Sequence, residues 1–356
     1  MPAMRPRARA FAFYLPQFHP IPENDEFWGP GFTEWTNVAR ARPLYRGHKQ
    51  PRLPGSLGFY DLRLPETRRE QAELARGSGI EGFVYWHYWF GGQRVLERPF
   101  QEVLASGEPD FPFALGWANE SWTGIWHGCP GRTLIQQTYP GPEDTRRHFA
   151  AIEAAFHDRR YVRIENKPLF YLYRPFEVPD RMATLHLWRS LARDSGLEDL
   201  YILAQVTKKD LRIHDLSDFD GAVVANYGLH PPGRIRSRWN RLWRRPRIVD
   251  YAQAWPDAIP HSVSQPTVHP TALPNWDNTP RSGIRGRVYE NATPEVFKRQ
   301  LDHALGMIAH KPMETRLVFL KSWNEWAEGN YLEPDLEHGH AWLDATRAAL
   351  LDPVQK

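Results

Sequence analysis

Two glutamates lie three residues apart in the segment WNEWAEG at residues 323–329. Cleavage of a glycosidic bond needs two carboxyl groups, one to activate the attacking oxygen and one to protonate the departing oxygen. On a turn, or on the first turn of a helix, Glu325 and Glu328 can share one face. We therefore predict that they are the catalytic carboxylates. The alternatives are that one of them caps the following helix or pairs with an arginine.

Other reactive side chains give weaker signals. Glu34 and Glu120 are further carboxylate candidates. Ser121 and Cys129 lack the surroundings of a nucleophile elbow, so acyl transfer has no support, and a single cysteine excludes an intramolecular disulfide. We expect no metal ion and no cofactor, because ligand spacing such as HExxH is missing around the residues that could cluster, namely His19, His87, His127, His269 and Asp277.

Short apolar and aromatic runs predict the strands that position these residues. The runs cover residues 9–18, 82–89, 113–118, 169–173, 201–205, 221–226, 272–276 and 317–322. Helical spacing is found between most of them, at residues 65–78, 143–159, 180–195, 293–310 and 340–351. Eight alternating units predict an α/β fold of the (β/α)₈ TIM-barrel type. An open doubly wound sheet is the alternative, although no Gly-rich phosphate loop follows any strand.

We treat residues 1–356 as a single domain with its barrel core at about 9–351. An arginine-rich insertion at 234–264 separates the sixth and seventh strands. Its arginines are interleaved with Ile235, Trp239, Leu242 and Trp243, and they are Arg234, Arg236, Arg238, Arg241, Arg244, Arg245 and Arg247. Such a stretch could contact an anionic membrane surface peripherally or hold phosphates, and a solvated insertion is the alternative.

Composition excludes some classes of function. The 24% charged and 41% hydrophobic content is that of a soluble globular protein, and a net charge of +3 does not indicate a nucleic-acid partner. No run of about 18 apolar residues predicts a spanning helix. No apolar stretch before Pro16 is long enough for a signal peptide, so cytoplasmic residence is expected.

Polar and aromatic residues gather where the predicted strands end. Active sites of such barrels lie at the carboxyl ends of the strands, and aromatic faces with polar groups suit sugar rings. We therefore expect an oligosaccharide or polysaccharide substrate, bound by Tyr14, Gln17, His19, Trp86, His87, Tyr88, Trp117, Asn119, Glu120, Trp122, Asn226, Tyr227, Trp276, Asp277, Asn278, Trp323, Asn324 and Trp326.

Several motifs resemble one known family. They are FYLPQFHP at residues 13–20, FWG at 27–29, GFTEW at 31–35, GFVYWHYWF at 82–90, WANE at 117–120, WDNTP at 276–280 and NEWAEG at 324–329. They resemble the WbsX-type proteins, which are labelled as glycosyltransferases of bacterial surface polysaccharide synthesis. Those proteins are similar to glycoside hydrolase family 99, the endo-α-1,2-mannosidases and mannanases. The resemblance extends from about residue 13 to residue 335.

The resemblance implies a retaining mechanism on an α-linked sugar. The family 99 motif Glu-Trp-x-Glu-Gly matches residues 325–329. By that resemblance Glu325 deprotonates the 2-hydroxyl of the sugar, which forms a 1,2-anhydro sugar, and Glu328 is the general acid and then the general base. With water as the acceptor the enzyme is a hydrolase, and with a second sugar it is a transferase. A donor-dependent glycosyltransferase of lipopolysaccharide assembly and a non-catalytic glycan-binding protein are the alternatives.

Overall fold

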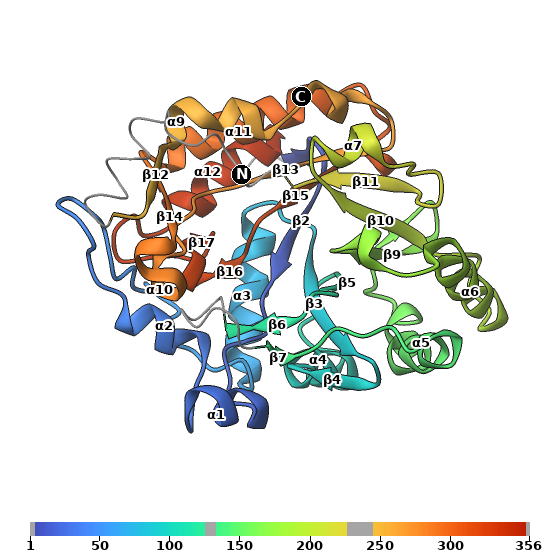
Figure 1. The fold of residues 1–356 in the computed structure, drawn as a ribbon. Helices are drawn as coiled ribbons and strands as arrows, with labels where there is room; N and C mark the ends of the chain where they lie inside the picture. Colours follow the sequence, from blue (N-terminus) through green and yellow to red (C-terminus); the bar gives the residue numbers. More distant parts are fainter. Residues whose placement is uncertain (1–3, 125–132, 226–244, 354–356) are drawn as a thin grey trace.

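The computed structural model describes residues 4–124, 133–225 and 245–353. Eight parallel strands of this part close into a barrel, because the last strand pairs with the first through Phe319 and Phe11. The (β/α)₈ fold is confirmed (Figure 1). In barrel order the strands are β2 (Arg9–Tyr14), β3 (Gly82–Phe90), β5 (Phe113–Trp117), β9 (Lys167–Leu172), β10 (Tyr201–Val206), β11 (Gly221–Val224), β13 (Val268–Ala272) and β15 (Leu317–Leu320).

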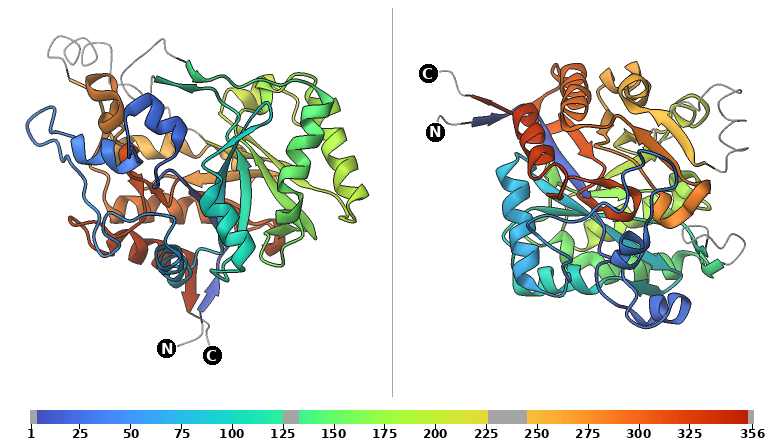
Figure 2. Two further views of the ribbon diagram at one scale, coloured as in Figure 1. Left: turned by 90° about the horizontal axis from the view of Figure 1, so that it is seen from below. Right: turned by 90° about the vertical axis from the view of Figure 1, so that its left-hand side faces the viewer.

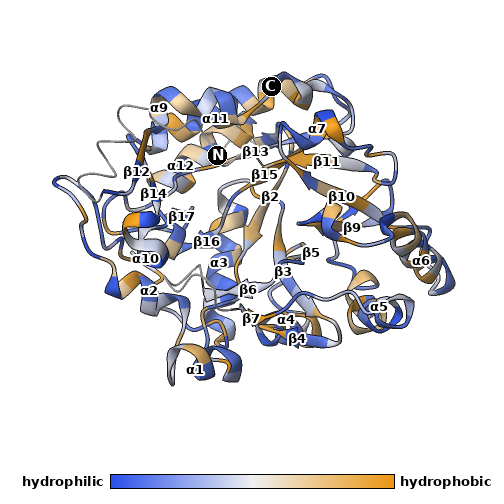
Figure 3. Ribbon diagram, viewed as in Figure 1, coloured by the Kyte–Doolittle hydropathy of each residue, from blue (hydrophilic) through white to orange (hydrophobic). Residues whose placement is uncertain are grey.

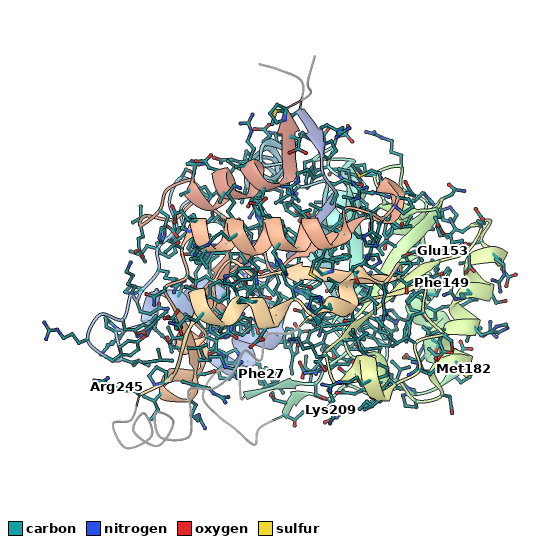
Figure 4. All side chains as sticks on the ribbon, turned by 90° about the horizontal axis from the view of Figure 1, so that it is seen from above. Phe27, Phe149, Glu153, Met182, Lys209 and Arg245 are labelled. Atoms are coloured by element: carbon teal, nitrogen blue, oxygen red, sulfur yellow. The ribbon has the colours of Figure 1, made fainter. Side chains whose placement is uncertain are left out.

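Helices cover the outside of the barrel. They are α3 (Pro65–Gly77), α4 (Arg98–Ser106), α5 (Pro142–Phe156), α6 (Arg181–Asp194), α7 (Asp210–Ile213), α9 (Tyr251–Ala254), α11 (Pro294–Ile308) and α12 (Ala341–Leu350). The predicted helices correspond to α3, α5, α6, α11 and α12, with small shifts at their ends. Within the layer, Phe149 of α5 packs against Trp188 of α6, while Met182 is 70% exposed at the outer edge (Figure 4).

The seventh predicted strand was misplaced. We expected it at 272–276, bracketed by Pro270 and Pro274, whereas β13 spans Val268–Ala272 and contains Pro270. Proline has no N–H to donate, so it is normally found at the edges of sheets. Here Pro270 lies opposite Val224, the last residue of β11, and its missing donor falls at the end of that ladder. Residues 273–276 instead lead into a loop at the mouth of the barrel.

Aromatic rings fill the interior of the barrel. Phe13 stacks on Trp86 with 4.8 Å between ring centroids, and it also contacts Tyr171 at 4.9 Å and Phe319 at 5.8 Å. Figure 3 shows hydrophobic residues along β2 and β10 and a mixture of hydrophobic and hydrophilic residues along α11. The interior is therefore a packed core, and a ligand has room only above the rings.

The loops at the carboxyl ends of three strands carry extra elements. The loop after β2 contains α1 (Pro22–Trp28) and α2 (Glu34–Arg40). The loop after β13 contains α10 (Thr279–Ser282), the 3₁₀ turn η5 (Gly283–Arg285) and β14 (Arg287–Glu290). The loop after β15 contains β16 (Asn324–Glu325), the 3₁₀ turn η7 (Trp326–Glu328) and β17 (Asn330–Tyr331). These loops supply most of the charged side chains of the site described below.

Smaller elements complete the described chain. They are the strands β4 (Gln93–Val95), β6 (Trp122–Thr123), β7 (Thr133–Ile135), β8 (Arg163–Ile164) and β12 (Arg247–Asp250), and the 3₁₀ turns η2 (Pro175–Glu177), η3 (Trp255–Ala258), η4 (His261–Ser264) and η6 (Met313–Thr315). Near the two ends, β1 (Met4–Pro6) pairs antiparallel with β18 (Leu351–Pro353), and Figure 2 shows them side by side. Their pairing brings the first and last described strands together.

Only part of the arginine-rich insertion is described. Arg245 and Arg247 are described, and Figure 4 shows Arg245 at the periphery of the molecule. Membrane contact through this segment stays a prediction, and none of the described helices combines the length and the apolar character that a membrane crossing requires. The other arginines of the segment lie outside the described residues, namely Arg234, Arg236, Arg238, Arg241 and Arg244.

At the opposite end of the barrel, a buried arginine ties helix α4 and the loop after it to the turn that follows α5. The guanidinium of Arg160 donates hydrogen bonds to the carbonyl oxygens of Val103 at 3.0 Å and Pro109 at 3.1 Å. It also pairs with the carboxylate of Asp158 at 2.7 Å. The neighbouring Arg159 pairs with Asp110 on the surface, where its side chain is 75% exposed.

We expect Arg160→Ala to lower the free energy of unfolding by about 3 kcal/mol, because it removes the buried side-chain hydrogen bonds to Val103 and Pro109 and the ion pair with Asp158. Arg159→Ala is the matched control and should change it by less than about 1 kcal/mol, as exposed ion pairs contribute little. Urea titration followed by circular dichroism measures both. Equal losses in the two variants would contradict this account of Arg160.

Candidate active site

A pocket with about 950 Å³ of open space lies at the carboxyl ends of the barrel strands. Its charged lining residues are Glu34, Glu120, Arg281, Lys321, Glu325 and Glu328. Its aromatic lining residues are Trp28, Trp86, Tyr88, Trp122, Tyr173 and Trp276. Smaller side chains complete the wall, namely Leu15, Gln17, Asn24, Ala118, Ser121, Thr123 and Leu134. Rings and carboxylates in one pocket are the combination expected of a sugar site.

The backbone explains why Glu325 and Glu328 face the same pocket. They bracket the 3₁₀ turn η7, and a 3₁₀ turn has three residues per turn, so side chains three apart align. Gly329 ends the turn with φ of 58°. A Cβ on Gly329 would lie 2.9 Å from the backbone nitrogen of Asp277, so glycine is required there. The Asp277 N–H also donates to the carbonyl oxygen of Glu328 at 2.6 Å.

One arginine binds both glutamates. The Nη2 of Arg281 lies 3.2 Å from Oε2 of Glu325, and its Nη1 lies 2.9 Å from Oε1 of Glu328. Its Nε donates to Oε1 of Glu34 at 2.7 Å. All four side chains are 10% exposed or less. Each glutamate therefore does pair with an arginine, as the alternative reading supposed, and both still line the pocket.

Burial and crowding change the protonation of these carboxylates. Burial raises the pKa of Glu328 to about 7, and the charge of Glu325 adds to this while Arg281 and Lys321 oppose it. The pKa of Glu34 is also raised, first by burial and then by Glu325. Burial alone would lower the pKa of Arg281. The negative charges of the neighbouring carboxylates have the larger effect, so the pKa of Arg281 is raised. Glu328 can therefore both give and take a proton near neutral pH.

Asp277 positions the arginine and lies outside the pocket lining. Its buried carboxylate accepts hydrogen bonds from His48 and Gln50, each at 2.8 Å, and from the hydroxyl of Thr279 at 2.6 Å. Burial would raise the pKa of Asp277, but the bond from His48 and the charge of Arg52 keep it low. The carboxylate thereby fixes the start of α10, the helix that carries Arg281.

Glu333 supports the segment of Glu325 and Glu328 from behind. Its buried carboxylate accepts hydrogen bonds from the indole N–H of Trp326 at 2.6 Å, from Gln71 at 2.6 Å and from Tyr60 at 2.9 Å. The hydroxyl of Tyr14 donates to Gln71 at 2.6 Å and so joins the same network. Trp326 and Tyr14 are thus bound behind the pocket lining, and the bond from Trp326 to Glu333 holds the backbone between the two glutamates.

The structure separates the predicted binding residues into two groups. It brings together Gln17, Trp86, Tyr88, Glu120, Trp122 and Trp276 with Glu325 and Glu328 in the pocket. It places away from the pocket lining Tyr14, His19, His87, Trp117, Asn119, Asp277, Asn278, Trp323, Asn324 and Trp326. Asn226 and Tyr227 lie outside the described residues. Of the described residues that we predicted to bind substrate, only those of the first group line the pocket.

Strand alternation explains the placement of His87. Side chains of β3 point alternately inward and outward, so Trp86 and Tyr88 line the pocket while His87 faces α5. The Nε2 of His87 lies 2.8 Å from Nε2 of His148, and burial lowers the pKa of His87 to about 3. In the part of the chain that the structure describes, no group of three or more His, Cys, Asp or Glu side chains is arranged to hold a metal ion.

Backbone contacts explain three further placements. Asn324 accepts a hydrogen bond from the Leu15 N–H at 2.7 Å and donates to the Leu15 carbonyl at 3.0 Å. Asn119 accepts from the Arg174 N–H at 2.8 Å and donates to its carbonyl. Asn278 accepts from the Arg287 N–H at 2.8 Å. These amides hold neighbouring loops in place, and each uses its side-chain oxygen to do so.

Some lining residues were missed in the sequence. Arg281 directly follows the motif WDNTP at 276–280, but it is one of many arginines and was not singled out. Trp28 lies in the motif FWG, which belongs to the family resemblance. Asn24, Tyr173 and Lys321 also line the pocket, but no motif of that resemblance contains them. The sequence does not show that these residues line one pocket, because that depends on how the loops are placed in the folded protein.

Comparisons with solved structures agree with the barrel. A protein titled "Glycoside hydrolase-like protein" superposes with a TM-score of 0.65 at 15% identity, over 97% of this chain and 94% of that chain. A GH99 endo-alpha-mannosidase from Bacteroides thetaiotaomicron, in complex with bis-tris-propane, superposes with a TM-score of 0.56 at 16% identity, over 96% and 95% of the two chains. At such identities the likeness supports the fold alone.

Comparisons with sequences identify the family. Two curated relatives, both named "Uncharacterized protein WxcX", come from Xanthomonas campestris pv. campestris strains ATCC 33913 and B100. Each is 40% identical to this chain over 352 residues, which are 96% of this chain and 50% of the relative. The chain thus spans about half the length of these relatives. The family model described as "Glycosyltransferase WbsX" matches residues 10–346, from the first barrel strand into the last helix. The chain therefore belongs to the glycosyltransferase WbsX family of carbohydrate-active enzymes.

Proposed function

We propose that this chain cleaves or transfers an α-linked sugar of a bacterial surface polysaccharide, with retention of configuration. The observation that carries the proposal is the placement of Glu325 and Glu328 in one pocket, both bound to Arg281. The aromatic side chains around them offer faces for sugar rings. Neither glutamate needs to be a covalent nucleophile in this mechanism.

The two glutamates divide the proton transfers. Glu325 takes the proton of the 2-hydroxyl, whose oxygen attacks the anomeric carbon, while Glu328 protonates the departing oxygen as its bond to that carbon breaks. Glu328 then takes the proton of an incoming hydroxyl, which opens the 1,2-anhydro ring, and Glu325 returns a proton to the 2-oxygen. Two inversions give retention. A pKa of about 7 suits Glu328 to both steps.

The acceptor decides between hydrolysis and transfer. The family is described as glycosyltransferases, which favours a second sugar as the acceptor. One structure of similar fold is titled an endo-alpha-mannosidase, an enzyme that acts on α-linked mannose, and this favours an α-glycoside as the donor. Both outcomes use the same first step, so both require Glu325 and Glu328.

A glycosyltransferase with a phosphate-activated donor is the second candidate, and the family description favours it. The charges that line the pocket argue against it. The pocket is lined by four acidic side chains, Glu34, Glu120, Glu325 and Glu328, and by two basic ones, Arg281 and Lys321. This excess of acidic groups repels a diphosphate. Thermal shift assays with nucleotide sugars and with neutral oligosaccharides distinguish the two, since a bound ligand raises the melting temperature. Stabilisation by nucleotide sugars alone would favour the second candidate.

We expect Glu328→Gln to reduce turnover about 100- to 10,000-fold, because the amide cannot transfer a proton to the departing oxygen. A panel of bacterial surface polysaccharides is incubated with each enzyme, and the products are identified by mass spectrometry. Glu143→Gln is the matched control, since Glu143 is exposed in the first turn of α5. Full turnover by a folded Glu328→Gln variant would rule out the proposed role.

The pH dependence offers an independent check. Glu328 must be protonated in the first step, so kcat/KM should fall as pH rises through about 7. The positive charge of Lys321 lowers the pKa of Glu328, so Lys321→Met should raise that pKa and move the alkaline limb to higher pH. Lys49→Met, at a side chain that is 70% exposed, should leave the limb in place. An alkaline limb that moves to lower pH in Lys321→Met would contradict this assignment.

A further inference from the structure

Two buried polar atoms in the pocket wall have no hydrogen-bond partner among the described residues. They are Nδ2 of Asn24 and Oε2 of Glu34. Both residues are only 1% exposed, and both line the pocket that contains Glu325 and Glu328. Burying an unpaired donor or acceptor costs free energy, so nearly all such groups in folded proteins are paired. An unpaired donor and an unpaired acceptor in one pocket wall therefore indicate a ligand that satisfies both.

The backbone around these two residues is held firmly. The carboxylate of Asp25 accepts hydrogen bonds from the N–H groups of Gly31 at 2.8 Å and Phe32 at 3.2 Å, which fixes the turn between α1 and α2. The Glu34 N–H donates to the carbonyl oxygen of Gln17 at 3.0 Å. The unpaired atoms are thus presented by a loop that is already folded around them, which reduces the ordering cost of binding.

The chemistry of the two atoms selects the ligand. An amide N–H donates and a carboxylate oxygen accepts, and a hydroxyl group accepts and donates at the same time. A phosphate or carboxylate ligand would instead be repelled by Glu34. Trp28 lies four residues after Asn24 on the same face of α1 and also lines the pocket, where its ring can cover a sugar face.

We propose that Asn24 and Glu34 form a subsite that binds a hydroxyl group of the sugar held in the pocket and so determines which sugar is accepted. The inference rests on the proposed function and adds a specificity determinant to it. The Glu34 carboxylate also has partners within the protein, because its Oε1 accepts a hydrogen bond from Nε of Arg281 at 2.7 Å and the side chain of Asn37 also bonds to it. The sugar hydroxyl would thus bind to the carboxylate of Glu34, which is paired with the same arginine, Arg281, as Glu325 and Glu328.

Asn24→Ala tests the subsite without disturbing Arg281. The substrate is the glycan that the wild-type enzyme turns over in the polysaccharide panel, together with its monodeoxy analogues. We expect kcat/KM for the intact glycan to fall about 10- to 100-fold, the usual effect of losing one hydrogen bond to a buried polar group. Glu26→Ala is the matched control on the same short helix, since Glu26 is exposed.

The monodeoxy analogues make the test specific. For one of them, the wild-type enzyme should show the same loss as Asn24→Ala shows with the intact glycan, and combining the two changes should add little further loss. Asn24→Asp should lose at least as much as Asn24→Ala, because the donor becomes a second acceptor. A loss in Asn24→Ala that is equal for the intact glycan and every deoxy analogue would overturn the subsite.

The outcomes also separate this inference from the proposed function. A wild-type enzyme that turns over no glycan of the panel would overturn both. Turnover that Glu328→Gln loses and Asn24→Ala retains in full would overturn the subsite alone. A selective loss in Asn24→Ala, with Glu26→Ala unchanged, supports both.

Discussion

The site depends on one shared positive charge. Arg281 is the cation on which Glu34, Glu325 and Glu328 converge, and each carboxylate comes within 3.2 Å of one of its nitrogens. Three buried carboxylates without a counter-charge would repel one another and would be protonated or displaced. The arginine keeps the carboxylates close together, and burial still leaves Glu328 able to exchange a proton near pH 7.

The layers behind the pocket serve to hold that arrangement. Asp277 fixes the helix of Arg281, and Glu333 fixes the indole of Trp326 between the two glutamates. These residues have the side chains expected of a binding site, since they are polar or aromatic, and they lie close to the ends of the strands. Their hydrogen bonds are nevertheless directed into the protein, where they give the reacting groups a defined geometry.

The sequence predicted the barrel and the glutamate pair because both leave local signals. Runs of apolar residues mark the strands, and a spacing of three marks Glu325 and Glu328. It did not predict which neighbours share the pocket, because that depends on loops that meet only in space. His87 was grouped with Trp86 and Tyr88, although alternation turns it outward, and Pro270 was taken as a boundary although it lies inside a strand. Arg281 was overlooked although it directly follows the motif WDNTP, because its carboxylate partners come from other loops.

The origin of the site residues along the chain has a consequence for biosynthesis. Glu34 follows the first barrel strand, Arg281 follows the seventh, and Glu325 and Glu328 follow the eighth. Arg281 and Glu34 are 247 positions apart, so their contact forms only when the loop after the seventh strand meets the loop after the first. A chain that has not yet reached Arg281 holds Glu34 without this counter-charge, and the charges of the pocket come together only when the barrel is nearly complete.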